Sequence, residues 1–546
     1  MITRRGVLRG VTGAAMGIAA GGALAACGGG GEEPAATEAS ATPRKGGKLR
    51  AAFIGGSAES TDPTLAANVG IDYVRARLVW DTLGELDGGK AVWRLAESVE
   101  PNADATKWTV RVRQGVTFSD GRQLTAKDVL FSLRTLVEKR SPQGGFITHL
   151  DLKNARAKDA RTVELPLTMP DGFFDLALAH SMFVFPDGTK DLTKAVGSGP
   201  YTLKKWQAGR SGILVPRADY WDGDNGGPYL DELELVSVTD AAARLSGLKS
   251  GQFGYAGGLG LTAVRTERGN DALRIELPPK DLWVDLTLTM NRGLKPFTDE
   301  RVVRAVKLAL DRESLVRTVT LGQGEAGNDL VGAHQPYFDT GIAQTAHDPE
   351  QAKKLLSEAG ADGLAVTIRT SNYDYGTEES AAAAVPMLAK AGIKASLDKV
   401  PAADYYSDFK TILGTPLQTA AYHPNPLPLM IRTYYGSTAP FPLTGTKDAA
   451  QADPLIAAMN RATGEKERAA RVADVQEYLH EHGGDALFAR VPTVSGAAAA
   501  THGVKPRGYA DYPSRAVAAP PPGWALVRRP PRSRGCGPNS AWTGPR

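Results

Sequence analysis

Few residues of the chain have types and spacing that suit catalysis or metal binding. Residues 84–91 read GELDGGKA, which matches the GxxxxGK of a phosphate-binding loop, but Ala91 stands where a Ser or Thr must reach magnesium. His480 and His482 are two positions apart in a predicted helix, so they lie on different faces and cannot share a zinc ion. The sequence contains no GxSxG elbow. We therefore expect no metal and no cofactor, and we predict no catalytic residue.

One cysteine lies where its thiol has a specific chemistry. Cys27 belongs to the stretch LAACGGGG, which follows the basic start TRRGVLR and a short apolar run from Val11 to Ala26. Glycines dilute this run, and it falls short of the about 20 mostly apolar residues of a membrane-spanning helix. Residues 1–26 therefore read as an export signal peptide.

The residues around Cys27 add two resemblances. LAAC is similar to the bacterial lipobox, which implies that the Cys27 thiol carries a diacylglycerol and becomes the first residue after cleavage. Acyl chains would then hold the protein at the membrane. TRRGVLR resembles a twin-arginine signal. The alternative is a chance cysteine after an apolar stretch.

Composition limits the remaining possibilities. The 546 residues are 42% hydrophobic and 23% charged, which is typical of a globular protein with material for about three domains of about 150 residues, or two large lobes. Arginines of the last segment carry much of the net charge of +4, so the body of the chain has no basic surface for nucleic acid. Cys536 is the only other cysteine, so lipidation of Cys27 would exclude an intrachain disulfide.

Local patterns place elements along the chain. Residues 27–45 are rich in Gly, Ala, Glu, Thr and Pro and predict a flexible tether, and residues 48–54 predict the first strand. Alternation from Trp108 to Val112 predicts a half-buried strand, and apolar residues at helical spacing follow the cap residue Thr125. A helix is also predicted between Asp348, which pairs with Gln351 as a cap, and Gly360. The fold is therefore mixed α and β.

Six longer stretches occur in one order along residues 46–513. They read DPTLAANVGIDYVRARLVWDTL, LAESVEPNADATKWTVRVRQGVTFSDGRQLTAKDVLFSL, GSGPYTLKKW, RADYWDG, MNRGLKPFTDERVVRAVKLALDR and DPEQAKKLLSEAG. In this order they resemble the extracellular solute-binding proteins of the peptide and nickel class, family 5, which serve ABC importers.

This resemblance implies the architecture. The fold would be the two-lobed α/β fold of periplasmic binding proteins, type II, of the large class with an extra subdomain in the first lobe. We expect lobe I with its subdomain over residues 46–260, lobe II over 261–478 and a return to lobe I over 479–514. Residues 515–546 are rich in Arg and Pro without a hydrophobic period, and predict a disordered tail.

The resemblance also implies the function. The protein would be no enzyme but the extracytoplasmic component of an ABC importer, which captures a peptide-like or other polar organic solute between its lobes and delivers it to membrane permease subunits. We expect a monomer, held by the lipid on Cys27 at the outer face of the cytoplasmic membrane. An exported hydrolase and a signalling lipoprotein that keeps the fold are the alternatives.

One segment bears on the solute. In peptide-binding relatives an acidic residue of an ADYPDP-like segment pairs with the ligand's ammonium, but residues 420–426 read AAYHPNP, with Tyr422 in place of that acid and Asn425 in place of the second. Burying an ammonium without a counter-charge is unfavourable, although a carboxylate such as Asp285 could substitute. Tyr422, His423 and Asn425 suit a capped peptide, a glycan or another polar organic solute. The alternative is a plain proline-rich loop.

Four further residues are candidates by the same resemblance. Asn68 and Val69 match the early segment whose backbone runs along bound peptide. Trp283 would line the cleft, or would instead be a core aromatic on a buried strand, and Phe146 would cover the pocket.

Overall fold

A computed structural model describes residues 45–504, 506 and 517–518, apart from 69, 181, 224–226, 373, 407 and 448. The predicted signal peptide, Cys27 and most of the predicted tether lie outside the described residues. Within the described part, no helix combines the length and the apolar character that crossing a membrane requires.

A first sheet is built around β1 (Lys48–Phe53), which confirms the first predicted strand. β1 pairs in parallel with β10 (Glu232–Ser237) and with β11 (Tyr255–Leu259). Its last three residues are buried, as expected for a central strand covered on both faces. The seven-stranded order is β12-β19-β11-β1-β10-β9-β8, with β8 (Tyr201–Gln207), β9 (Ser211–Pro216), β12 (Leu273–Glu276) and β19 (Val494–Ala498).

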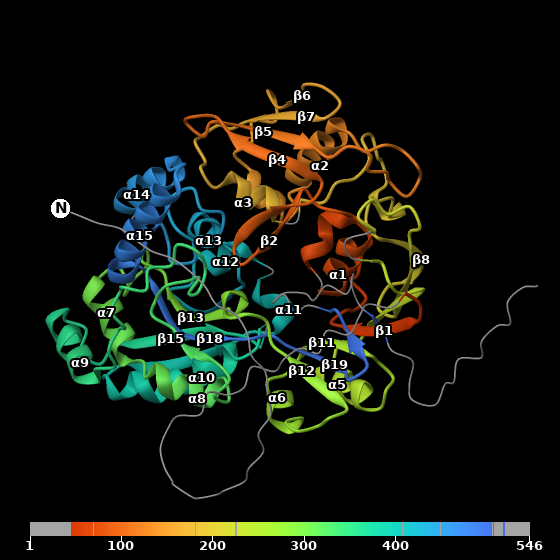
Figure 1. Ribbon diagram of the computed structural model, residues 1–546. Helices are drawn as coiled ribbons and strands as arrows, with labels where there is room; N and C mark the ends of the chain where they lie inside the picture. The colour runs from red at the N-terminus through yellow and green to blue at the C-terminus, as the bar shows by residue number, and fades with distance from the viewer. Residues whose placement is uncertain are drawn as a thin grey trace, which may run out of the picture. The chain divides into compact units, whose positions relative to one another are not determined.

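A second sheet of six strands is built around β13 (Val284–Met290), in which every residue is buried. β13 lies antiparallel between β17 (Leu417–Tyr422) and β18 (Asp485–Val491). The order is β14-β18-β13-β17-β15-β16, with β14 (Glu325–Ala326), β15 (Ala365–Thr370) and β16 (Lys394–Lys399). Helices α8 (Arg312–Val319) and α10 (Thr377–Lys390) pack on each other and on strands of this sheet (Figure 1).

Residues 84–180, called here the inserted segment, separate β1 from the next strand of the first sheet. They contain the four-stranded sheet β4-β5-β7-β6 and the hairpin β2-β3 (Figure 1). Their bounds are β2 (Gly84–Asp87), β3 (Lys90–Trp93), β4 (Ala96–Pro101), β5 (Lys107–Val112), β6 (Arg156–Ala157), β7 (Thr162–Pro166), α2 (Ala126–Glu138), η2 (Gly144–Ile147) and α3 (Phe174–Ala179). The predicted alternation is confirmed, because Trp108, Val110 and Val112 are the buried residues of β5.

The predicted helix caps are confirmed in atomic detail. At the start of α2, the backbone N–H of Thr125 donates to Asp128 Oδ2 at 2.7 Å. At the start of α9 (Pro349–Glu358), the backbone N–H of Gln351 donates to Asp348 Oδ1 at 2.8 Å. Both bonds involve carboxylates at the start of a helix, Asp128 in the first turn of α2 and Asp348 at the N-cap of α9, where the helix dipole favours negative charge.

The remaining helices flank the sheets. They are η1 (Pro63–Asn68), α1 (Gly70–Val79), η3 (Leu192–Lys194), α5 (Ala241–Lys249), α6 (Thr262–Thr266), η4 (Lys280–Leu282), α7 (Glu300–Ala309), α11 (Ala402–Tyr405), α12 (Phe409–Leu413), α13 (Leu427–Tyr434), α14 (Ala449–Arg461) and α15 (Glu465–His482). One core cluster joins residues of the inserted segment, such as Trp108, to residues of α13 and α15, such as Leu429 and Val472.

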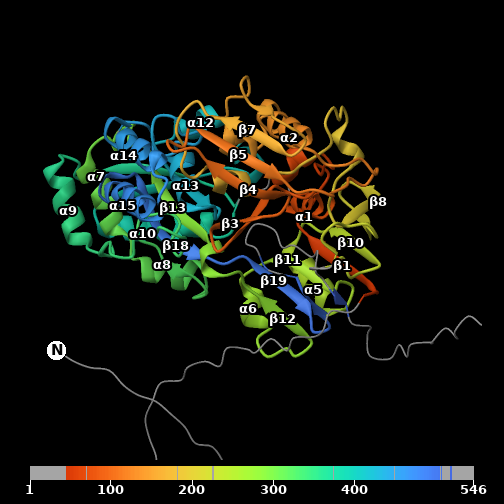
Figure 2. The same ribbon diagram turned by 45° about the horizontal axis from the view of Figure 1, so that its top comes forward.

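The chain changes sheets between β12 and β13, and again between β18 and β19, where Figure 2 shows the blue ribbon passing from one sheet to the other. The boundary predicted at 260/261 is therefore too early, because β12 still belongs to the first sheet. The return predicted at residue 479 is also too early, because β18 pairs with β13. Strand pairing decides these positions, and local sequence patterns do not encode it.

The segment 515–546 also departs from its prediction at two residues. Val517 and Ala518 form β21, which pairs with β20 (Thr501–His502). Backbone hydrogen bonds to a neighbouring strand require no hydrophobic period, so the composition of the segment did not indicate this strand. The rest of that segment lies outside the described residues.

Candidate functional site

Tyr422 is the last residue of β17, and its side chain is directed into the protein. The side chain is 1% exposed, and its ring stacks on Tyr434 with centroids 4.3 Å apart. Its hydroxyl donates to Asp485 Oδ1 at 3.0 Å, and the Tyr435 hydroxyl donates to Asp485 Oδ2 at 2.7 Å. Burial raises the pKa of Asp485, although these hydrogen bonds oppose the shift. In this arrangement the Tyr422 ring packs on Tyr434 and the Tyr422 hydroxyl donates a hydrogen bond to the buried carboxylate of Asp485. Contact of Tyr422 with a solute stays a prediction.

His423 offers a polar edge next to Tyr422. His423 Nε2 and Asp374 Oδ2 share a hydrogen bond of 3.0 Å, and the two side chains are 33% and 23% exposed. Burial lowers the pKa of His423, but the charge and hydrogen bond of Asp374 outweigh burial, so the pKa is raised above its usual value. The imidazole therefore holds its proton more firmly than a free histidine does.

Asn425 joins the segment after β17 to the inserted segment. Its Nδ2 donates to the His423 carbonyl oxygen at 3.3 Å, and its amide lies close enough to His180 to favour the protonated form of that imidazole. Burial and the charge of Arg77 lower the pKa of His180 to about 4, so its ring is neutral at pH 7. The His180 ring lies 4.7 Å from the Phe146 ring, edge to face. The structure thus brings two predicted site residues, Asn425 and Phe146, near the same histidine.

Trp283 lies in the first connection between the two sheets. It is 8% exposed, and its Nε1 donates to the Pro278 carbonyl oxygen at 3.1 Å. Lys280 Nζ lies 5.8 Å from the ring centroid, in the geometry of a cation–π contact. These contacts fix the ring in the connection, and its contact with a solute stays a prediction.

The other predicted residues have less structural context. Asn68 is the last residue of η1, ahead of α1. Val69 and Cys27 lie outside the described residues.

Asp285 is not available as a free counter-charge. Arg490 Nε donates to Asp285 Oδ1 at 2.7 Å, and both side chains are 2% exposed. The backbone N–H of Gly332 donates to the other carboxylate oxygen at 2.8 Å. Because its charge is already balanced, Asp285 does not replace the acid missing from residues 420–426.

Residues 171–173, called here the bridging loop, tie the inserted segment to α13. The Asp171 carboxylate is fully buried, and it accepts from Arg432 of α13 and lies 2.9 Å from His149 Nε2. Burial alone would raise the pKa of Asp171, but the charge of Arg432 and the hydrogen bond of His149 hold it well below its usual range. The aspartate is therefore charged at any physiological pH.

The bridging loop also contacts α14 and α15. The backbone N–H of Gly172 donates to the Asn460 carbonyl oxygen at 2.6 Å, and its carbonyl oxygen accepts from Arg468. A Cβ on Gly172 would lie 1.8 Å from the Ala462 carbonyl oxygen, so a side chain would separate the two backbones. The loop is thus held by three successive helices.

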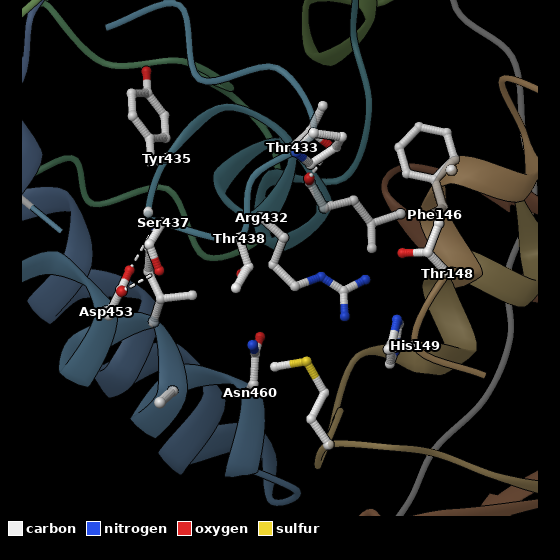
Figure 3. A pocket seen from close by; sticks show the side chains of 17 residues that line it. Phe146, Thr148, His149, Arg432, Thr433, Tyr435, Ser437, Thr438, Asp453 and Asn460 are labelled. Atoms are coloured by element: carbon white, nitrogen blue, oxygen red, sulfur yellow. Dashed lines mark hydrogen bonds between the residues drawn. The ribbon is translucent and has the colours of Figure 1, made fainter. Parts of the chain in front are cut away.

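A cavity of about 290 Å³ lies next to the bridging loop. Figure 3 shows Arg432 extending into it between His149 and Asn460. Phe146, Met169 and Asp453 also line it. The walls therefore come from the inserted segment on one side and from α13 and α14 on the other.

The motifs that we set aside are structural. Residues 84–91 lie in the β2-β3 hairpin, whose turn residues Gly88 and Gly89 have positive φ. His480 Nε2 lies 3.2 Å from Asn328 Oδ1, and His482 Nδ1 lies 3.3 Å from Glu300 Oε1, so the two histidines contact different partners. Among the described residues no group of three His, Cys, Asp or Glu side chains could hold a metal ion.

Sequence reasoning missed several residues of this region. Asp374 is 49 positions from His423, and Asp171 is 261 positions from Arg432. No motif spans such separations, so these pairs gave no signal in a single sequence.

Comparison with known proteins identifies the chain. The family model of the bacterial extracellular solute-binding proteins, family 5 (middle), matches residues 90–439, more than half of the sequence. The chain belongs to this family. This solute-binding protein is therefore the solute-binding component of an ABC importer and no enzyme, as the resemblance implied.

Curated relatives of this solute-binding protein agree. The oligopeptide-binding protein AppA of Bacillus subtilis is 27% identical over 411 residues, which cover 68% of this chain and 72% of AppA. The glutathione-binding protein GsiB of Salmonella typhi is 26% identical over 358 residues, which cover 64% of this chain and 69% of GsiB.

Solved structures confirm the predicted fold class. The structure of AppA of Bacillus subtilis in complex with a nonapeptide superposes with a TM-score of 0.71 at 21% identity, and the superposition covers 88% of this chain and 100% of the AppA chain. The structure of NikA of Brucella suis in complex with Fe(III)-EDTA superposes with a TM-score of 0.75 at 19% identity, and the superposition covers 87% of this chain and 100% of the NikA chain. The mixed α/β fold is that of the periplasmic binding proteins.

Proposed function

We propose that this solute-binding protein captures a peptide-like or other polar organic solute between the inserted segment and the part of the chain around the second sheet, and delivers it to permease subunits. The observation that carries the proposal is the cavity of about 290 Å³, which brings the Phe146 ring of the inserted segment together with the polar side chains of Arg432 and Asn460. Asn425 lies near His180, whose ring is 4.7 Å from the Phe146 ring, at the same junction. Relatives that bind oligopeptides and glutathione support the solute class.

The chemistry of the contact favours a neutral or polar solute group there. His180 is neutral at pH 7, Asn425 supplies an amide, and the Phe146 ring supplies an apolar face. A solute contacts both parts of the chain only when the two parts lie close together. It therefore binds this closed arrangement more tightly than an open one and shifts the population toward it. The proposed ligand contacts are Asn68, Val69, Phe146, Trp283, Tyr422, His423 and Asn425.

Native mass spectrometry of protein purified from its own cells tests the solute. We expect a retained small molecule, and adding that molecule back should raise the melting temperature while leaving the molecule intact, because a ligand that binds the folded state stabilises it by mass action. Chemical conversion of the retained molecule would overturn the proposal.

We further propose that a lipid on Cys27 holds the protein at the outer face of the cytoplasmic membrane. The LAAC motif supports this anchor, and tethering would raise the effective concentration of the receptor near its permease. Cys27→Ala should move the protein from the membrane fraction to the soluble fraction. Cross-linking of the wild-type protein to permease subunits would distinguish an importer from a signalling lipoprotein.

A further inference from the structure

A second cavity, of about 530 Å³, lies between the inserted segment and the residues that follow β9. Arg94, Glu97 and Arg113 line it from the inserted segment, and Trp221 and Asp222 line it from the other side. Its volume falls in the range of about 300–1,000 Å³ that is typical of small-molecule sites. It shares no lining residue with the cavity beside the bridging loop, and none of the predicted solute contacts lines it. It is therefore a separate candidate site.

The indole ring of Trp221 forms a fixed wall of this second cavity. Its Nε1 donates to Asp81 Oδ2 at 2.7 Å, and Asp81 is buried. The guanidinium carbons of Arg94 and Arg113 lie 5.3 and 5.0 Å from the Trp221 ring centroid, in the geometry of cation–π contacts. The ring therefore holds both arginines in place.

The two arginines differ in their charge partners. Arg94 Nη2 lies 2.8 Å from Asp222 Oδ2, and Arg94 Nε lies 3.6 Å from Glu85 Oε1, so acids balance the charge of Arg94. Arg113 Nε donates to the Arg94 carbonyl oxygen at 2.9 Å. In the described part of the chain no carboxylate pairs with Arg113, and its two terminal nitrogens have no hydrogen-bond partner. Arg113 is thus a fixed guanidinium whose charge is uncompensated.

This arrangement selects the chemistry of a ligand. A fixed guanidinium with two free terminal nitrogens suits a carboxylate, which accepts two parallel N–H hydrogen bonds. A phosphate ester fits less well, because the carboxylates of Glu97 and Asp222 in the same cavity would repel its charge of about −2 more strongly than a single negative charge. The same two carboxylates can accept hydrogen bonds from hydroxyl groups of a ligand. The ring of Trp93, which also lines the cavity, offers an apolar face.

We propose that this cavity is a second binding site, which takes a small hydroxylated carboxylate such as a sugar acid. The carboxylate of the ligand would pair with Arg113, its hydroxyl groups would donate to Glu97 and Asp222, and its apolar face would lie on Trp93. This inference goes beyond the proposed function, because it assigns a ligand to residues outside the predicted solute contacts.

Calorimetric titration with D-glucuronate, D-glucuronamide and cyclohexanecarboxylate tests the site. The second probe replaces the carboxylate by a neutral amide, and the third keeps the carboxylate but lacks the hydroxyl groups. For the wild-type protein we expect glucuronate to bind about tenfold or more tightly than glucuronamide, because hydrogen bonds to a charged group are lost with the amide. Cyclohexanecarboxylate should also bind more weakly than glucuronate. Arg113→Gln should abolish the preference for glucuronate over glucuronamide.

A second variant keeps the test valid where Arg113→Gln fails to fold. Gln114 is exposed and lines the cavity, so Gln114→Glu adds a negative charge to the wall without disturbing the core. This variant should weaken glucuronate binding, and the effect should shrink at high salt because salt screens exposed charges. Gln123→Glu is the matched control, since it makes the same change at an exposed residue of the inserted segment that does not line the cavity. It should bind glucuronate as the wild-type protein does.

Three results would overturn the proposal. Glucuronate does not bind, glucuronamide binds equally well, or both Arg113→Gln and Gln114→Glu bind glucuronate as the wild-type protein does, which would place the probe elsewhere. The solute retained from cells tests the import function separately. Its binding should be unchanged in Gln114→Glu, so loss of the second site and failure of the proposed function are distinguishable.

Discussion

Replacing Asp171 by Asn should weaken the attachment of the inserted segment to α13. The carboxylate is fully buried and the Arg432 side chain is 15% exposed, so the substitution leaves a mostly buried cation without its counter-charge. Removing one partner of a buried ion pair costs about 3–5 kcal/mol, and the partial exposure of Arg432 puts the expected loss near the lower limit, about 3 kcal/mol. Urea unfolding at pH 7 measures this loss.

The pH dependence of the same variant gives a second test. Because the pKa of Asp171 is held below its usual value, its contribution to stability is present above the unfolded-state pKa of about 3.9 and is lost as the pH falls below it. The difference in unfolding free energy between wild type and Asp171→Asn should therefore stay constant between about pH 5 and 8 and shrink only below about pH 4.

Asp120→Asn is the matched control for Asp171→Asn. Asp120 pairs with Arg122 at 2.7 Å in the same inserted segment, but the two side chains are 34% and 54% exposed. Exposed pairs contribute about 0–1 kcal/mol, so this variant should lose little stability. If Asp171→Asn loses no more stability than Asp120→Asn, the bridging loop does not hold the two parts together by this ion pair.

Three further substitutions test neighbouring contacts. Tyr422→Phe removes a hydrogen bond to Asp485 and should lower the unfolding free energy in urea by about 1–2 kcal/mol; an unchanged midpoint would contradict that bond. Asp374→Asn should lower the pKa of His423 in an NMR titration. In the wild-type protein this pair stabilises the fold below the unfolded-state pKa of histidine, about 6.5, and the stabilisation is lost as the pH rises through the folded-state pKa; the variant should lack it. Gly172→Ala places a Cβ 1.8 Å from the carbonyl oxygen that follows α14 and should cost about 1–3 kcal/mol, whereas full stability would show that the loop can move away.

Local sequence patterns determined the elements of this protein and, through the resemblance, its family. Alternation from Trp108 to Val112 predicted β5, and the carboxylate of Asp348 predicted the start of α9. These signals are reliable because the residues that form a strand face or a helix cap are neighbours in the sequence. The order of the longer stretches predicted the solute-binding family, which the family match confirms.

Only the tertiary structure decided which side chains meet. The sequence predicted a ligand contact for Tyr422, which stays a prediction, whereas the packing of its ring on Tyr434 and its hydrogen bond to Asp485 follow from the position of β17 beside β13. The ion pair of Asp171 with Arg432 joins residues 261 positions apart. Contacts of this kind depend on strand order and helix packing, which are set by burial of the whole core and leave no periodic trace around either residue.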